Sequence, residues 1–183
     1  ESATAQRQPQ GVARRFEFNT MARRIAQLPH RLTGDQLNGL RTIYREMRKG
    51  YPARILLNGD VGTGKTMTFG AVAVAVLDEG GRVLVLVPNT VLVAQISGEI
   101  QRFWPDIEAT CVIGDGESPP PDARFVVGTT AILHQDLGRF DLVIVDEQHK
   151  FAALQREHYV RGAAHLIEAT ATCIPRSLAI AQL

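Results

Sequence analysis

The chain has 183 residues, of which 45% are hydrophobic and 21% are charged, an ordinary globular composition. This length suits one domain with a substantial core and is too short for two ordinary domains. Residues 1–10 are polar and lack the apolar core of a secretory signal, and no apolar run approaches the roughly 20 residues of a membrane span, so no membrane role is expected.

The net charge of +1 hides an asymmetry between the two parts of the chain. Residues 1–54 carry eleven Lys/Arg and four Asp/Glu, a balance of +7, whereas residues 55–183 have a balance of −6. A basic segment of this kind can follow a phosphate backbone, and it can equally be the solvated face of Arg-rich helices. The aromatic content of 6% argues against a base-stacking platform.

The leading segment predicts two helices. Residues 1–12 are expected to be disordered, and residues 16–27 favour a helix that ends before Pro29. Thr33 is the expected N-cap of a second helix. Its apolar positions recur at spacings of three and four, at Leu37, Leu40, Ile43, Tyr44 and Met47.

From residue 55 onward, short apolar runs alternate with helical stretches. Each run is continuous, which is typical of parallel strands buried on both faces. The expected strands are 55–57, 83–87, 110–113, 125–127, 142–145 and 166–167, and the clearest helices are 65–77 and 91–103. This alternation predicts a three-layer α/β fold around a mainly parallel sheet.

The segment from Gly59 to Thr66 reads GDVGTGKT and fits the P-loop pattern, between an expected strand and an expected helix. Glycines in such a loop let backbone N–H groups converge on phosphate oxygens beside a positive helix N-terminus. Lys65 would bridge the β- and γ-phosphates of ATP, and the Thr66 hydroxyl would bind Mg²⁺. The candidate nucleotide-binding residues are Gly59, Gly62, Thr63, Gly64, Lys65 and Thr66.

Two adjacent carboxylates, Asp146 and Glu147, follow the apolar run 142–145. A nucleotide held by a P-loop needs a carboxylate near its magnesium ion, at the end of another strand of the same sheet. Asp146 suits that role, and Glu147 would act as the general base that polarises the attacking water. Taken alone, these residues could also form an acidic solvated loop.

Three segments, GDVGTGKT, DEQHKFAALQR and ATATCIPRS, together resemble the first motor lobe of superfamily-2 helicases. Within that group they resemble the RecG-type branch-migrating DNA helicases. The resemblance covers residues 30–183 and implies a RecA-like helicase ATP-binding domain over 31–183, preceded by a basic extension over 1–30. It also implies ATP and Mg²⁺ as cofactors and DNA as the partner.

The same resemblance assigns roles to residues outside the P-loop. Gln36, within Leu-Thr-Gly-Asp-Gln, would read the adenine edge. Asn89 and Thr90 resemble a segment that contacts the DNA backbone, and Gly128 and Thr129 resemble a second such segment. Taken alone, these two segments would more often be an N-cap or a turn.

Further roles concern the γ-phosphate. Gln148 and His149 would sense it and pass its state to a coupling segment that includes Thr170 and Thr172. That segment follows a strand, 166–169, which in this architecture lies between the P-loop strand and the Asp146 strand. His165 has no such context and is expected to be a surface or core residue.

The sequence departs from the family in three respects. Cys173 stands where the family has proline, and the segment between residues 111 and 125 is short. The chain also stops at Leu183, so the second motor lobe with its arginine fingers is expected to lie in a longer protein or to act in trans.

These features predict the ATP-binding lobe of an ATP-dependent DNA helicase or translocase, cytoplasmic or nucleoid-associated. A non-catalytic ATP-dependent adaptor and an RNA helicase of the same superfamily are the alternatives. An intact Glu147 disfavours the adaptor, and Gln148 disfavours the RNA helicase.

Overall fold

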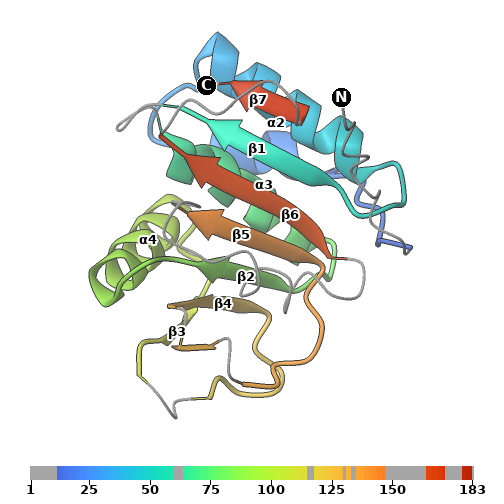
Figure 1. Ribbon diagram of the computed structural model, residues 1–183. Helices are drawn as coiled ribbons and strands as arrows, with labels where there is room; N and C mark the ends of the chain where they lie inside the picture. Colours follow the sequence, from blue (N-terminus) through green and yellow to red (C-terminus); the bar gives the residue numbers. More distant parts are fainter. Residues whose placement is uncertain are drawn as a thin grey trace, which may run out of the picture.

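The computed structural model describes residues 12–59, 64–114, 118–129, 131–132, 135–146 and 164–171, and the backbone of 179–182. Four helices and seven strands lie in these ranges (Figure 1). The helices are α1 (Met21–Ala26), α2 (Gly34–Met47), α3 (Lys65–Asp78) and α4 (Thr90–Phe103). The strands are β1 (Arg54–Asn58), β2 (Val83–Leu86), β3 (Thr110–Val112), β4 (Phe125–Gly128), β5 (Leu142–Asp146), β6 (His165–Thr170) and β7 (Ala179–Gln182).

The strands form one sheet in the order β3-β4-β2-β5-β6-β1-β7, and every described pair is parallel. The predicted α/β fold with a parallel sheet is therefore confirmed. β6 lies between β1 and β5, as expected for the coupling strand. β7 was not predicted, because its sequence Ala-Ile-Ala-Gln lacks the β-branched run of the other strands; it adds to the edge of the sheet beside β1.

The sheet is buried on both faces, which explains why its strands read as continuous apolar runs. In β2, Val83 and Val85 belong to the larger apolar cluster, together with the helices. Leu84 and Leu86 alternate with them and join a second cluster with Ile132 on the opposite face. The sheet is thus the middle layer of the domain.

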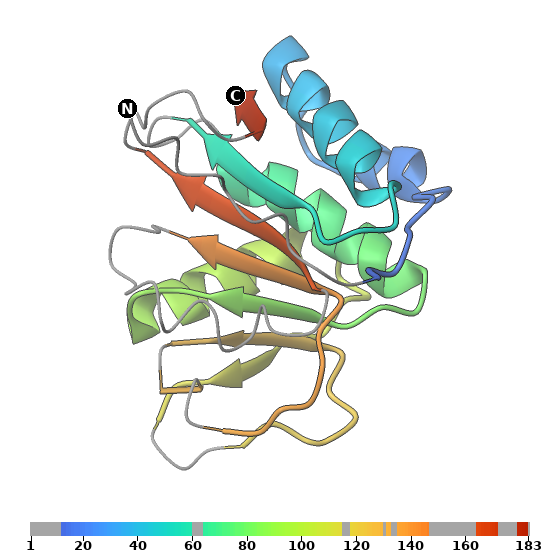
Figure 2. The ribbon, with the colours of Figure 1, turned by 45° about the vertical axis from the view of Figure 1, so that its right-hand side comes forward.

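Helix α3 is the centre of the helical layer. Its residues from 68 to 77 are all buried. The helix packs on the sheet and contacts each of the other described helices, with α4 beside it on the same face (Figure 2). Gly70 allows α4 to approach closely, since a methyl group at this position would lie 2.6 Å from Ile100 Cδ1 and 3.0 Å from the Trp104 ring. A helix that is apolar all round is expected in this central place.

Residues 12–20, here called the strap, differ from the prediction of a helix over 16–27. Helix α1 begins only at Met21, so the prediction was wrong at its start. Phe16 and Phe18 lie two residues apart and are both buried, with ring centroids 6.0 Å apart. Residues 12–18 form neither helix nor strand, and Phe18 has a φ of +48°. Burial of both rings in the core therefore outweighs the local helical preference.

Among the residues that the structure describes, no helix is long and apolar enough to cross a membrane.

Candidate nucleotide-binding site

Most of the predicted site residues that the structure describes lie at the carboxyl edge of the sheet, where parallel strands present ligand sites in open α/β folds. Asn58 ends β1, Asp146 ends β5, and Thr170 ends β6 between them. The strands are held in register, because Asn58 pairs with Thr170 and Asp146 pairs with Ala169. The Gly59 N–H then donates to Thr170 O at 3.1 Å. This bond ties the start of the P-loop to the end of the predicted coupling strand.

Gly64 and Lys65 form the start of α3. Gly64 is the N-cap residue and has φ of +76°, a left-handed conformation that favours glycine. Lys65 is the first helical residue, and its Nζ donates to Gly59 O at 2.6 Å. The ammonium group therefore lies beside the first glycine of the loop, at the positive end of a helix of 14 residues. This arrangement suits an anion.

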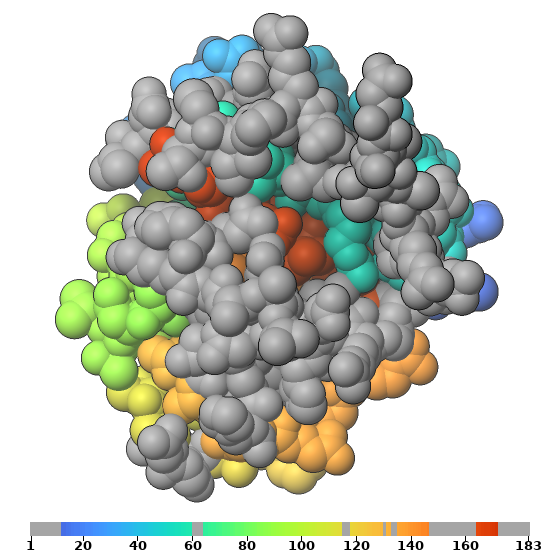
Figure 3. Space-filling model, viewed as in Figure 1, coloured from blue at the N-terminus to red at the C-terminus, as the bar shows by residue number. Residues whose placement is uncertain are grey.

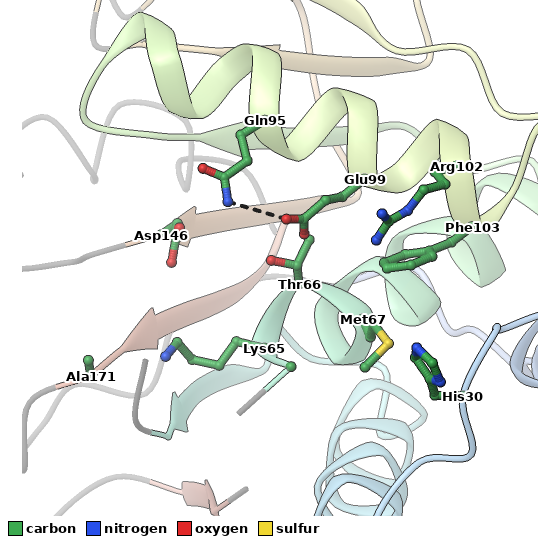
Figure 4. A pocket seen from close by; sticks show the side chains of 11 residues that line it. His30, Lys65, Thr66, Met67, Gln95, Glu99, Arg102, Phe103, Asp146 and Ala171 are labelled. Carbon is green, nitrogen blue, oxygen red and sulfur yellow. Dashed lines mark hydrogen bonds between the residues drawn. The ribbon is translucent and has the colours of Figure 1, made fainter. Parts of the chain in front are cut away.

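Lys65, Thr66 and Asp146 line one cavity of about 380 Å³, although Asp146 comes 80 positions after Thr66 in sequence (Figure 4). Hydroxyl and carboxylate oxygens are hard donors of the kind that Mg²⁺ prefers. Mg²⁺ is commonly held by only one or two carboxylates together with substrate phosphates. Thr66 and Asp146 therefore fit a magnesium ion that is bound with a nucleotide.

Gln36 is 5% exposed and completes a capping box at the start of α2. Its Oε1 accepts from the Thr33 N–H at 2.8 Å, and its own N–H donates to Thr33 Oγ1 at 3.2 Å. Its Nε2 lies against Gly64, since a methyl group there would be 2.5 Å away. Thr33 is thus the N-cap, as predicted. Gln36 connects α2 to the start of α3, and it is not among the residues that line the cavity.

The residues predicted to contact DNA also lie at the carboxyl edge. Asn89 is the N-cap of α4, and its Oδ1 accepts from the Leu92 N–H at 3.0 Å. Thr90 follows it and is exposed. Gly128 ends β4, and Thr129 Oγ1 accepts from the Ala131 N–H at 3.4 Å. The capping and turn roles that the sequence left open are therefore present, on the same edge as the cavity.

Six predicted site residues lie outside the described residues: Gly62, Thr63, Glu147, Gln148, His149 and Thr172.

The cavity has a second wall that sequence reasoning missed. Gln95, Glu99 and Arg102 from α4 line it, and the Gln95 Nε2 donates to Glu99 Oε1 at 3.2 Å. Met67 and His30 line the part nearest the leading segment, as Figure 4 shows. The recurrence of polar residues at 95, 99 and 102 marks one side of α4, but nothing in the sequence indicates that this side faces the P-loop.

The parallel sheet and the two described ends of the P-loop, Gly59 and Gly64 with Lys65, are those of a P-loop nucleotide-binding domain of the α/β class. Residues 30–174 match the family model described as "Type III restriction enzyme, res subunit" (ResIII). The chain therefore belongs to the ResIII helicase family, and it corresponds to the N-terminal, RecA-like motor lobe of superfamily-2 helicases.

Proteins of similar sequence are named as helicases, in agreement with this family. The chain is 35% identical over 173 residues to a protein named ATP-dependent DNA helicase RecG from Helicobacter pylori, covering 86% of this chain and 27% of that protein. It is 30% identical over 167 residues to the RecG of Streptococcus pneumoniae, covering 84% of this chain and 25% of that protein. The chain thus spans about a quarter of the length of these relatives.

Solved structures show the same fold. The structure of RecG bound to a three-way DNA junction matches with a TM-score of 0.68 and 28% identity, covering 91% of this chain and 24% of that one. The Sulfolobus solfataricus SWI2/SNF2 ATPase core in complex with double-stranded DNA matches with a TM-score of 0.64 at 21% identity, covering 80% of this chain and 33% of that one.

Proposed function

We propose that this chain is the ATP-binding motor lobe of an ATP-dependent DNA helicase or translocase that acts on branched DNA. The observation that carries the proposal is the cavity shared by Lys65, Thr66 and Asp146 at the carboxyl edge of the sheet. The relatives named as RecG helicases, one of them solved on a DNA junction, support DNA as the partner. Cytoplasmic or nucleoid-associated action follows from this proposal.

The residues divide the chemistry among them. The P-loop backbone and Lys65 bind the phosphates of ATP, and Thr66 and Asp146 hold Mg²⁺, which offsets phosphate charge when it is bound. Glu147 takes a proton from the attacking water. Gln148 and His149 respond to the γ-phosphate. The adenine contact of Gln36 stays a prediction, because its side chain is buried in the capping box and does not line the cavity.

The link to DNA runs through β6. The Gly59–Thr170 hydrogen bond joins the start of the P-loop to the coupling segment, which contains Thr170 and Thr172. A change at the phosphates can therefore pass to that segment. Asn89, Thr90, Gly128 and Thr129 lie at the carboxyl edge of the sheet and contact the DNA backbone. A second RecA-like lobe, in a longer chain or in trans, closes the cleft and supplies arginine fingers, which contribute about 10³–10⁵ in rate in related NTPases.

The test is phosphate release from Mg-ATP by the 183-residue chain, with and without forked DNA, alongside binding of a fluorescent ATP analogue. We expect nucleotide binding with very slow turnover. Lys65→Ala should lose binding, whereas Glu147→Gln should keep binding and lose the remaining turnover. A wild-type chain that does not bind the nucleotide contradicts the proposal.

A further inference from the structure

The exposed side of α2 carries a row of arginines. Arg41, Arg45 and Arg48 follow each other at spacings of four and three, which places them on one side of the helix. All three are exposed, and the Arg45 side chain is 70% accessible. The row is about 10 Å long at 1.5 Å per residue, which matches about three phosphates along one strand of B-DNA.

The strap adds a further cation to this row. The Ala13 N–H donates to Gly50 O at 3.1 Å, so residues 13–15 run beside the end of α2. The Arg15 side chain lies against Gly50, since a methyl group there would be 2.5 Å from Arg15 Nε. Lys49 is exposed at the same end of the helix. We call the resulting surface the basic face; it consists of Arg15, Arg41, Arg45, Arg48 and Lys49.

Two carboxylates, Glu46 and Glu17, pair with the basic face but leave it positive. Glu46 is within 2.5 Å of Lys49 Nζ and 3.7 Å of Arg45 Nε, and Glu17 is 3.3 Å from Arg48 Nε. Five cations and two carboxylates leave a local charge of +3. The Glu46 side chain is only 18% accessible, whereas the Arg45 side chain is 70% accessible. A ligand in solution therefore reaches the Arg45 guanidinium more easily than the Glu46 carboxylate.

Aromatic rings hold part of the basic face in place. The Arg48 guanidinium lies over the Tyr44 ring at 5.1 Å, and Lys49 Nζ lies 5.7 Å from the Tyr51 ring centre. Tyr51 is 47% exposed beside them. Positioned guanidinium groups suit phosphate oxygens, which they can bind with two parallel hydrogen bonds.

The basic face lies apart from the nucleotide cavity. Helix α2 begins beside Gly64 at the carboxyl edge and runs to the opposite edge of the sheet, a length of about 21 Å for its 14 residues (Figures 1 and 2). In the space-filling view, the first described residues and the end of α2 share the right-hand side of the molecule, while α4 lies on the left (Figure 3). The face is therefore not part of the carboxyl edge proposed above to contact DNA.

We infer that the basic face binds the phosphate backbone of a duplex DNA arm, as a contact separate from the carboxyl edge. Its cations match phosphates in charge and spacing. Contacts of this kind position a duplex without reading its sequence.

The test is the fluorescence anisotropy of a labelled 30-base-pair duplex titrated with the 183-residue chain, without nucleotide, from 50 to 200 mM salt. Arg41→Gln and Arg45→Gln keep helix propensity while they remove one charge each. Arg23→Gln is the matched control, because Arg23 is an exposed arginine on α1, outside the basic face. Circular dichroism and binding of a fluorescent ATP analogue verify that each variant is folded.

We expect each basic-face substitution to weaken binding several-fold and to lower the slope of log K against log salt by about 1, and the double variant by about 2. Arg23→Gln should match the wild type. A double variant with the wild-type slope, or a wild-type chain without duplex binding, overturns the inference. Displacement of the duplex by polyglutamate of equal charge as effectively as by unlabelled duplex also overturns it, since the face would then not select phosphate chemistry.

The same variants separate this inference from the proposed function. Arg41→Gln and Arg45→Gln should bind the ATP analogue as the wild type does, and Lys65→Ala should keep the salt slope of duplex binding. A chain that binds duplex through the basic face but binds no nucleotide would contradict the motor-lobe proposal alone.

Discussion

His165 shows how a single buried residue can connect distant parts of the chain. It is fully buried at the start of β6, as a core histidine. Its Nδ1 accepts from the Ala53 N–H at 3.1 Å, so the proton of the neutral ring sits on Nε2, which is 2.7 Å from Arg14 O. The ring thereby joins the strap to the beginnings of β1 and β6. A second proton on Nδ1 would break the bond to Ala53.

We predict that His165 makes the stability of the domain depend on pH. Burial is the main cause that lowers the pKa of His165 in the folded chain. As pH falls through about 6.5, the unfolded chain takes up a proton that the folded chain does not, so the free energy of unfolding should fall. Urea unfolding at pH 7.5 and pH 5.5 measures this change.

The His165→Asn variant should be less stable at pH 7.5 and should lose part of this pH dependence, because the group that titrates has been removed. A variant with the full wild-type difference between the two pH values would show that the effect arises at other residues.

At the scale of elements, α1 is joined to the rest of the helical layer by Arg24. Its guanidinium donates to both carboxylate oxygens of Asp78, at 2.6 and 2.7 Å, and to Asp106 at 2.8 Å. The Trp104 Nε1 donates to the Arg24 carbonyl at 2.9 Å. Residues at the ends of α3 and α4 therefore meet on one turn of a six-residue helix. A helix this short needs such contacts, because isolated helices of this length are unstable.

We predict that Arg24→Gln lowers the free energy of unfolding by about 1–3 kcal/mol at pH 7, because the partly buried Asp78 loses its charged partner. The hydrogen bond from Arg24 holds the pKa values of Asp78 and Asp106 below their usual range. The contribution of the Arg24 contacts to the free energy of unfolding is therefore present above about pH 4, and it is lost as pH falls through the lowered pKa values of the two carboxyl groups.

Chemical denaturation of Arg24→Gln and of Arg23→Gln at pH 7 and pH 3 tests this prediction. The Arg23→Gln control should change stability by less than about 0.5 kcal/mol, as is usual for an exposed position. Equal effects of the two substitutions at pH 7 would rule out a structural role for the Arg24 contacts.

At the scale of the whole molecule, the strap is part of the core. Phe16 is fully buried and Phe18 is 5% exposed, and both belong to the apolar cluster that covers the helical face of the sheet. The Phe18 ring also lies 5.6 Å from the Tyr44 ring of α2. The strap thus closes the apolar core of the domain, and its Arg15 belongs to the basic face.

We predict that Phe16→Ala destabilises the domain by about 3–5 kcal/mol, the range for loss of a buried aromatic side chain. Val12→Ala is the control, because Val12 is 85% exposed at the start of the strap and should change stability little. The midpoints of urea unfolding compare the two. A small effect of Phe16→Ala would mean that the strap does not pack on the domain in solution.

The sequence by itself determined the sheet strands from β1 to β6 and the start of α3. A strand buried on both faces needs a continuous apolar run, and a P-loop needs glycines such as Gly64 directly before Lys65, so both leave a local pattern. The strap, β7 and the α4 wall of the cavity leave no such pattern. Phe16 lies outside any helix because its ring packs in the core, and Glu99 meets the cavity because Gly70 lets α4 approach α3. Only the tertiary structure decided these features, since they depend on contacts between residues far apart in the chain.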